Sequence, residues 1–371
     1  MNLPARPDWS GRLQRLRDDY RKLKLEGFVV STARNLTYLT GFTGSAGLLV
    51  DAGGEASLLL DGRYVSAAQQ DVADGELGPV QVVGVTRRYE ETLAGVLERL
   101  GTREAGFEAE DVSVATLSRW QRAAPQVDWM PTEGLVSARR AIKDRGEVAV
   151  LRRAGQALAL IARRLRDWVA EGRTEREIAR DIDAALERAG FSEPAFPTIV
   201  ASGPNSAHPH ARPTDRRLRQ GDLVVLDFGG RLDGYCGDLT RMAGVGQVRA
   251  EAQALFEAVR DAQAAALAAV GAGVLASSVD AAARQVLETR GLGRAFLHAT
   301  GHGLGLDVHE APRIAREDSD GAARLEAGMV CTIEPGAYVE GLGGVRLEDD
   351  VLVTTEGCEV LTDAPRGLLV V

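Results

Sequence analysis

The sequence LVVLDFGGRLDGYCGDLTR, residues 223–241, places aspartates where a buried strand normally has apolar side chains. Asp227 ends an apolar run typical of a buried strand, and a Leu-Asp-Gly turn signal follows at 232–234. Asp238 lies in a second extended segment, so a hairpin would bring the two carboxylates together. Carboxylates in an apolar setting repel each other and need a cation or a shared proton. The alternative is that Asp233 and Asp238 only serve turns.

A second group of polar residues lies in HATGHGLGLDVHE, residues 298–310, which holds three of the five histidines of the chain. Glycines occupy every second position from 301 to 305, which predicts a bent loop or strand rather than a helix. These glycines would allow the backbone to approach a neighbouring group closely, with His302 and His309 beside it. His298 taken alone is more typical of a histidine satisfied within the core.

Two glutamates occupy positions where a strand is expected to be apolar. Glu334 follows an apolar run and precedes a Pro-Gly turn in TIEPGAY, residues 332–338. Glu348 lies two positions after Arg346 in GGVRLEDDVLV, residues 343–353, so a single strand would present both side chains on one face. The alternative for Arg346 and Glu348 is an ion pair on an exposed strand face.

The composition is that of an ordinary globular protein. With 371 residues, 45% of them apolar, the chain exceeds the usual size of one hydrophobic core. A net charge of -9 argues against a nucleic-acid partner, because binding to phosphate backbones needs a basic surface. We also expect no membrane partner and a cytoplasmic location, because the sequence has no signal-peptide core and no uncharged apolar run of about 18 residues.

The order of the predicted elements divides the chain into two domains, 1–135 and 136–371. The first alternates helix and strand and is predicted to be an α/β domain; the second has long helices and strand-rich segments and is predicted to be α+β. In the first domain, helices are predicted at 10–25 and 89–100, and strands at 27–32, 46–51 and 55–60. In the second domain, helices are predicted at 142–172, 174–190, 250–273 and 277–291, and strands at 222–229, 329–336 and 344–354.

Taken together, five residues resemble the ligand set of a metallopeptidase family. They are Asp227, Asp238, His302, Glu334 and Glu348, in the settings DFGG, GDLTR, GHGLG, EPG and RLED. Motifs in this order are similar to those of the family that includes methionine aminopeptidase, aminopeptidase P and prolidase, which share the pita-bread fold. The segment NLTYLTGFTGSAG, residues 35–47, is similar to a strand-and-turn segment of the creatinase-type domain of proline-directed members. The resemblance therefore implies a creatinase-like α/β domain followed by a pita-bread catalytic domain.

The resemblance implies that these five ligands hold two divalent metal ions. Two aspartates and two glutamates bring four negative charges, which balance the charge of two such ions. One imidazole among oxygen ligands favours Mn²⁺, and Co²⁺ or Zn²⁺ would also suit the set. By analogy with the family, a water between the metals attacks the scissile carbonyl, and Glu334 is both a ligand and the acceptor of the water's proton.

The resemblance also assigns roles outside the ligand set. His210, in NSAHPHARPT, matches a histidine on the loop that lines the substrate site, whereas His208 matches none. His309 matches the histidine that contacts the substrate carbonyl and stabilises the tetrahedral intermediate. His210, His309 and Glu334 are therefore the predicted catalytic residues.

Two proline-directed activities are compatible with this resemblance. Arg313, in VHEAPRI, matches an arginine with which prolidases bind the free carboxylate of an Xaa-Pro dipeptide, and we place Arg346 in the substrate site with it. These assignments favour an Xaa-Pro dipeptidase that acts on proline-containing dipeptides or short peptides and forms a homodimer. The alternatives are an aminopeptidase P that accepts longer peptides, and an exposed loop position for Arg313.

Other members of the fold fit the sequence less well. The activity of a methionine aminopeptidase does not require an additional domain such as residues 1–135 of this chain, so this member is a less suitable match. A binding protein on the same fold, or a metal-free hydrolase of the creatinase type, would show substitutions among the ligands. All five ligand positions keep metal-binding side chains, which argues against both alternatives.

Overall fold

The computed structural model of the chain describes residues 7–316 and 322–371. The chain divides into two compact units, Arg6–Arg140 and Ala141–Val371, called here the N-terminal and C-terminal units. The boundary predicted at residue 135 lies just before helix α6 (Ser137–Ala141), and this helix contains the division. Among the described residues, no helix is both long enough and apolar enough to cross a membrane.

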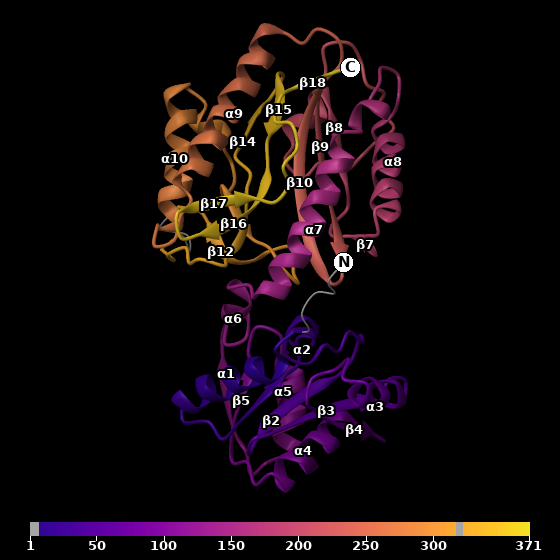
Figure 1. Cartoon of the computed structure of the whole chain (residues 1–371), viewed down its shortest axis with the longest axis vertical. Helices are drawn as coiled ribbons and strands as arrows, with labels where there is room; N and C mark the ends of the chain where they lie inside the picture. Colours follow the sequence, from indigo (N-terminus) through magenta and orange to yellow (C-terminus); the bar gives the residue numbers. More distant parts are fainter. Residues whose placement is uncertain (1–6, 317–321) are drawn as a thin grey trace. The chain divides into compact units, whose positions relative to one another are not determined.

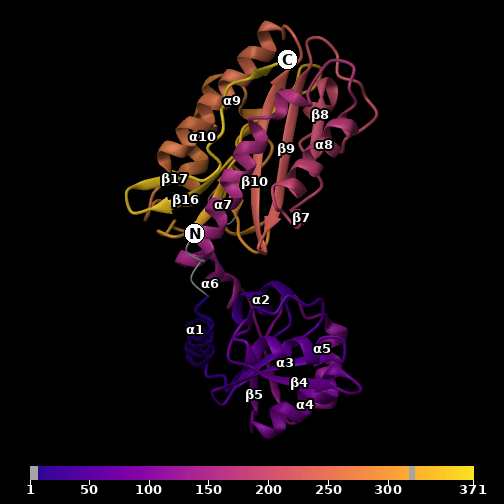
Figure 2. The same ribbon diagram turned by 45° about the vertical axis from the view of Figure 1, so that its right-hand side comes forward.

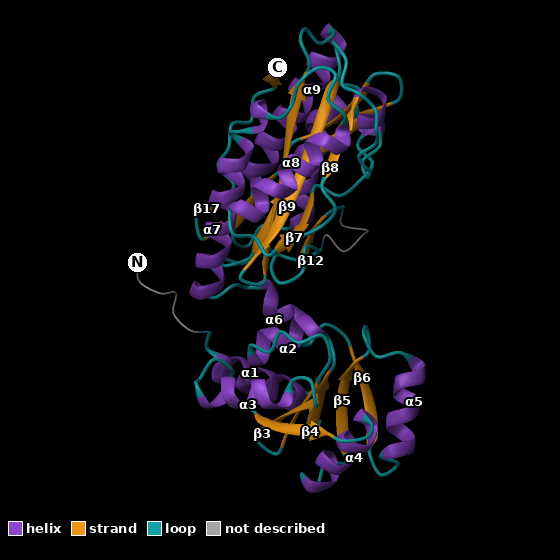
Figure 3. Ribbon diagram, turned by 90° about the vertical axis from the view of Figure 1, so that its right-hand side faces the viewer, coloured by secondary structure: helices purple, strands orange, loops and turns teal. Residues whose placement is uncertain are grey.

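The N-terminal unit is a six-stranded sheet with helices on both faces (Figure 3). The strand order is β4-β3-β2-β1-β5-β6, and β2 pairs antiparallel with β1 and with β3, while the other pairs are parallel. Besides α6, its elements are α1 (Trp9–Lys22), β1 (Gly27–Val30), α2 (Ala33–Thr40), β2 (Leu48–Ala52), β3 (Glu55–Asp61), α3 (Val65–Ala73), β4 (Gln81–Val85), α4 (Tyr89–Arg99), β5 (Glu104–Glu108), α5 (Val114–Ala123) and β6 (Asp128–Thr132). The predicted α/β organisation is confirmed.

Strand β1 shows how the two faces of this sheet are covered. Successive side chains of a strand point to opposite faces. Phe28 stacks on Tyr20 of α1, with ring centroids 6.4 Å apart, whereas the next residue, Val29, belongs to the buried cluster that contains Leu93 and Leu97 of α4. The apolar run therefore serves both faces, as expected for a central strand.

Residues 35–47 correct the sequence prediction, because they begin with a helix rather than a strand. Helix α2 buries Leu36 and Leu39 on one side, a spacing of three residues that suits a helical turn. Gly41 adopts φ 82° and ends the helix in the left-handed conformation that glycine permits. A short apolar run is compatible with either element, and the glycine stop signal is what distinguishes them here.

The C-terminal unit contains two five-stranded sheets and one two-stranded sheet. One sheet has the order β18-β10-β9-β7, with β8 also on β9; the second has the order β12-β11-β13-β16-β17; β14 and β15 form the third. Its strands are β7 (Glu193–Pro194), β8 (Ile199–Ser202), β9 (Leu223–Leu232), β10 (Tyr235–Gly244), β11 (Gly301–Gly303), β12 (Glu310–Ile314), β13 (Val330–Ile333), β14 (Gly336–Val339), β15 (Gly343–Arg346), β16 (Asp349–Thr354), β17 (Gly357–Val360) and β18 (Leu369–Val370).

Four long helices cover these sheets. They are α7 (Arg145–Ala162), α8 (Glu175–Arg188), α9 (Ala250–Ala269) and α10 (Ala276–Thr289). Figures 1 and 2 show α7 and α8 beside β8, β9 and β10, and α9 and α10 on the side of the unit that holds β16 and β17. Helices α7, α8 and α9 lie within their predicted segments, α10 begins one residue before its predicted segment, and the predicted α+β organisation is confirmed.

The predicted hairpin is present in β9 and β10. Asp227 lies opposite Thr240 in the antiparallel register, and Asp238 is two residues from Thr240, so both carboxylates project from the same face. The turn between the strands is made by Asp233, with φ 47°, and Gly234, with φ 85°. Positive φ at both central residues gives the twist that joins two paired strands. Asp233 therefore serves the turn, and Asp238 belongs to the sheet.

The segment 344–354 also differs from its prediction as one strand. It forms β15, which pairs with β14, and β16, which pairs with β13. Glu348 lies where the chain crosses between these two sheets, and its N–H donates to the carbonyl oxygen of Thr240, 3.3 Å away. Arg346 and Glu348 are therefore not neighbours on one strand face, because the chain changes partners between them.

The glycines around His302 make room for neighbouring backbone. A Cβ atom at Gly301 would lie 1.9 Å from the carbonyl oxygen of Thr332, and one at Gly303 would lie 2.1 Å from that of Ala311. These contacts explain the close approach that the glycine pattern predicted. The groups that approach are the strands on either side of β11.

We predict that Gly303→Ala lowers the free energy of unfolding of the C-terminal unit by about 1–3 kcal/mol, because backbone must shift to admit the methyl group. Denaturant unfolding would measure the loss. Gly367→Ala is the matched control, because a Cβ atom at Gly367 would meet nothing within 4 Å. Equal stability of the two variants would show that β11 has room for a side chain.

Candidate active site

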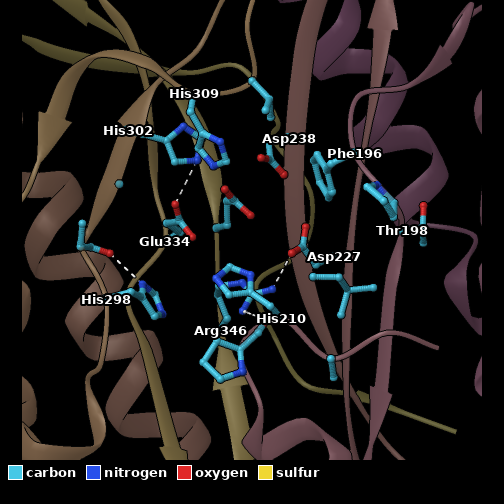
Figure 4. A pocket seen from close by; sticks show the side chains of 18 of the residues that line it. Phe196, Thr198, His210, Asp227, Asp238, His298, His302, His309, Glu334 and Arg346 are labelled. Atoms are coloured by element: carbon cyan, nitrogen blue, oxygen red, sulfur yellow. Dashed lines mark hydrogen bonds and ion pairs between the residues drawn. The ribbon is translucent and has the colours of Figure 1, made fainter. Parts of the chain in front are cut away.

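All nine predicted site residues line one cavity of about 700 Å³ (Figure 4). They are His210, Asp227, Asp238, His302, His309, Arg313, Glu334, Arg346 and Glu348. Apolar side chains complete the wall, among them Phe196, Ile199 and Val308. His208, which the sequence comparison set aside, is not among the described residues that line the cavity. The structure thus brings together residues that lie far apart in the chain.

The two aspartates of the hairpin are buried and only partly satisfied. Asp227 is 6% exposed and Asp238 is 5% exposed. The Oδ1 atom of each is buried and has no hydrogen-bond partner among the described residues. The N–H of Asp238 donates to the Oδ2 atom of Asp350, 3.0 Å away, which adds a further buried carboxylate that the sequence analysis did not identify. Buried unpaired carboxylate oxygens are costly, so this site needs a cation or protons.

The other three predicted ligands surround these aspartates. Ligand atoms of Asp238, His302 and Glu348 lie within 4.8 Å of one another. The Nε2 atom of His302 is 3.2 Å from the Oε1 atom of Glu334. Glu348 is 2% exposed and accepts a hydrogen bond of 2.5 Å from the hydroxyl of Thr240. Figure 4 shows His302 and Glu334 facing the two aspartates across the cavity.

The protonation of the cluster follows from burial and mutual repulsion. Burial, together with the neighbouring carboxylates, raises the pKa of Asp238 and of Glu348 well above the usual range. Burial would also raise the pKa of Glu334, but hydrogen bonding and charge from His302 outweigh it and lower this pKa to about 2. The same contact raises the pKa of His302 against the effect of burial. Without a cation, burial and repulsion therefore favour the protonated forms of Asp238 and Glu348, and the contact with Glu334 favours the protonated form of His302.

Arg346 is buried beside Asp227, which excludes the alternative of an exposed ion pair with Glu348. It is 4% exposed, and its Nη2 atom lies 2.5 Å from the Oδ2 atom of Asp227. Its Nη1 atom donates to the hydroxyl of Tyr338 at 2.7 Å and to the carbonyl oxygen of Pro209 at 3.2 Å. These contacts orient Asp227. Arg346 also lines the cavity, which is compatible with the predicted contact with substrate. That contact stays a prediction.

Three histidines border the cluster. The ring of His309 lies 4.2 Å from that of His302, centroid to centroid, at an interplanar angle of 71°. Burial and the nearby His302 lower the pKa of His309. His298 lines the cavity, and its Nε2 atom is 3.0 Å from the hydroxyl of Tyr338, so it is satisfied as expected but lies in the site rather than in the core. His210 is exposed and lines the same cavity.

A buried glutamate that the sequence analysis did not identify fixes the loop that carries His210. Glu175, the first residue of α8, is fully buried. Its carboxylate accepts hydrogen bonds from the N–H and hydroxyl groups of Ser202, both at 2.7 Å, and from those of Thr214, at 2.9 and 2.6 Å. The amide of Asn205 donates to both of its oxygens. Glu175 therefore joins the two ends of the loop.

The described residues fit a divalent cation site. Four carboxylates and one imidazole converge on the cavity, and two of the carboxylates keep a buried oxygen without a partner. Carboxylate-rich sites with one imidazole suit Mn²⁺, Co²⁺ or Zn²⁺. A largely buried set of this kind at the wall of an open cavity is typical of metal-dependent hydrolases.

Comparison with known proteins assigns the chain to a family. Residues 149–355 match metallopeptidase family M24, and residues 12–142 match the creatinase/prolidase N-terminal domain. The chain belongs to metallopeptidase family M24 and is a metallopeptidase with the pita-bread fold. The family match confirms the predicted fold class, and it implies divalent metal ions as cofactors.

Individual relatives are similar over nearly the whole chain. A Bacillus subtilis protein named uncharacterized peptidase YqhT is 34% identical over 97% of this chain and 99% of its own length. The solved structure of an Xaa-Pro dipeptidase from Bacillus anthracis has a TM-score of 0.94 and 32% identity, covering 98% of this chain and all of the other. An X-Pro aminopeptidase from Thermotoga maritima has a TM-score of 0.86 and 31% identity, covering 95% of this chain and all of the other.

We predict that Mn²⁺ stabilises the protein, by about 2.7 kcal/mol at one hundred times its dissociation constant, because the folded site binds the ion and the unfolded chain does not. Thermal unfolding at increasing Mn²⁺ concentrations would show this rise. Asp238→Asn removes a ligand and should abolish most of the rise. Asp167→Asn, an exposed carboxylate paired with Arg164, is the control and should keep it. Loss of the rise in both variants would contradict the assigned site.

Proposed function

We propose that this metallopeptidase cleaves the Xaa-Pro bond with two divalent ions, Mn²⁺ favoured, and prefers dipeptides. The observation that carries the reaction is the convergence of all five predicted ligands on one cavity that also contains His309 and Arg313. The similarity to proteins named Xaa-Pro dipeptidase and X-Pro aminopeptidase supports a proline-directed substrate. A homodimer and a cytoplasmic location stay predictions from the sequence.

Asp227, Asp238, His302, Glu334 and Glu348 would hold the ions. When bound, divalent ions lower the pKa of a water molecule and polarise the scissile carbonyl group. Glu334 lines the cavity with its Oε1 atom 3.2 Å from the Nε2 atom of His302, and by analogy with the family we assign it the uptake of the water's proton. The guanidinium of Arg346 keeps Asp227 in place and offsets part of the charge of the cluster.

His309 is placed to stabilise charge that develops on the substrate. Its lowered pKa keeps the imidazole neutral at pH 7, so the ring carries one N–H that can donate to the carbonyl oxygen of the scissile bond. A donor aimed at this oxygen gains strength as the oxygen becomes negative in the transition state. His210 borders the same cavity from the loop that Glu175 joins, and we assign it to substrate binding.

The preference for dipeptides depends on the cations at the cavity wall. Arg313 is exposed and lines the cavity, which allows it to bind the free carboxylate of a proline residue. Phe196, Ile199 and Val308 supply apolar surface suited to the proline ring. Arg212, an exposed residue of the His210 loop, is a second cation at the wall.

Cleavage of longer peptides is the second candidate function. It is favoured by the similarity to the X-Pro aminopeptidase structure, which extends over 95% of this chain. An aminopeptidase must leave the carboxyl side of proline open for further residues, whereas a dipeptidase closes it with a cation. The two functions therefore make opposite predictions for the arginines of the cavity.

We predict that His309→Ala lowers kcat for an Xaa-Pro dipeptide by about 10²- to 10³-fold, which is the usual effect of removing one transition-state donor. Its stabilisation by Mn²⁺ should persist, because His309 is not one of the five assigned ligands. Initial rates at saturating substrate, beside thermal unfolding with Mn²⁺, would measure both. An unchanged kcat would remove His309 from the mechanism.

We further predict that Arg313→Ala raises KM for a dipeptide Xaa-Pro at least tenfold more than for a tripeptide Xaa-Pro-Yaa, because only the dipeptide carries its carboxylate on proline. Arg212→Ala is the matched variant, with the same charge removed from the same cavity. Selective loss in the Arg212 variant alone would move the carboxylate contact to that residue. Equal losses on both peptides in both variants would favour the aminopeptidase function.

A further inference from the structure

A buried ion pair lies directly beside His309 and is formed by two residues outside the ligand set. The Nζ atom of Lys143 is 2.7 Å from the Oε1 atom of Glu310. The side chain of Lys143 is fully buried and that of Glu310 is 5% exposed. Glu310 follows His309 in the chain and lines the cavity. We propose that Lys143 is a positioning residue, which holds His309 in place through Glu310.

Lys143 is itself firmly anchored. Its N–H donates to the carbonyl oxygen of Gly328, 2.9 Å away, and its ammonium group also donates to the carbonyl oxygen of Ala141 at 3.2 Å. The next residue, Asp144, caps helix α7 through a capping box. The ammonium group therefore projects from a fixed stretch of backbone, so it can fix the position of Glu310 at the start of β12.

Glu310 connects this anchor to the turn between β11 and β12. Its backbone is in register with Gly303, next to His302, and its Oε2 atom is 3.5 Å from the N–H of Asp307. A Cβ atom at Gly305 would lie 2.3 Å from its Oε1 atom. The third glycine of the GHGLG motif therefore leaves space for the carboxylate that meets Lys143. The ion pair thus ties the turn between β11 and β12 to the backbone that carries Lys143.

The charges explain why the pair matters for His309. A buried carboxylate that loses its cation must find solvent or another partner. The accessible direction for Glu310 is the cavity that it lines, and a turn of its side chain in that direction would move the adjacent His309. The chain has 44 lysines and arginines together, and only three of them are lysines, so a lysine at position 143 is an unusual choice of cation for this chain. A compact ammonium group suits this enclosed position better than the larger planar group of arginine.

The inference rests on the proposed function of His309, and a double-mutant cycle tests it. Lys143→Met should lower kcat for an Xaa-Pro dipeptide by about ten- to one-hundred-fold and leave KM nearly unchanged, because the His309 contact strengthens in the transition state. Adding His309→Ala to Lys143→Met should cost no more than His309→Ala alone. Lys22→Met, an exposed lysine of α1, is the control. Additive losses would show that the pair only supports the fold.

A second readout needs no substrate and stays informative if the protein hydrolyses neither peptide. In the full chain with Zn²⁺, a diamagnetic ion, NMR of histidine labelled with ¹³C at Cε1 alone should give at most five signals, with that of His309 identified by its loss in His309→Ala. Lys143→Met should shift or broaden this signal. Lys143→Met with Glu310→Gln, which leaves no buried charge, should restore it.

If Lys143→Met does not fold, Glu310→Gln alone and Lys143→Arg are the variants to use in the same NMR measurement. Each disturbs the pair and should move the His309 signal in the same way. An unmoved His309 signal in every folded variant would overturn the inference. A moved signal in a protein inactive on both peptides would instead keep the positioning role and refute the proposed function.

Discussion

The repulsion among four largely buried carboxylates is the constraint on which the C-terminal unit depends. Asp227 and Asp238 are fixed on one face of a hairpin, and Glu348 lies where the chain crosses between two sheets. Neither aspartate can move toward solvent without disturbing the pairing of β9 with β10. The fold therefore maintains a concentration of negative charge that protons, Arg346 and His302 only partly offset. Divalent cations are the natural counter-charge for such a site.

Around this cluster, the two segments that carry His210 and His309 are each held by a buried polar contact. Glu175 joins the ends of the loop that carries His210, and Lys143 with Glu310 closes the turn that carries His309. Charged groups enclosed in this way have few alternative partners, so they restrict the side chains beside them. The cavity thus combines a cluster of charged side chains suited to divalent cations with two histidine-bearing segments that buried contacts hold in position, as precise positioning for catalysis requires.

The sequence predicted which residues converge on the cavity better than it predicted the contacts around them. Asp227 was a candidate because an acid at the end of an apolar run violates the strand pattern, whereas the pattern left Asp238 open as a turn residue. The resemblance of five motifs to a metallopeptidase family is what assigned both as ligands. The end of one strand and the start of the next around Glu348 could not be predicted, because the chain changes strand partners there without a glycine or proline. The ion pair of Lys143 with Glu310 spans 167 positions, and no local pattern connects such residues. Long-range contacts that support a site are visible only in the folded structure.

The most direct test of the central claim is the number of divalent ions that the cluster binds. Elemental analysis of the full chain, after chelation, reloading with Mn²⁺ and removal of free ion, would give this number without any assumption about substrate. The account predicts two ions per chain, and a loss of both when Asp227 and Asp238 are replaced together by asparagine. A chain that binds no ion, or that keeps two ions in this double variant, would contradict the account.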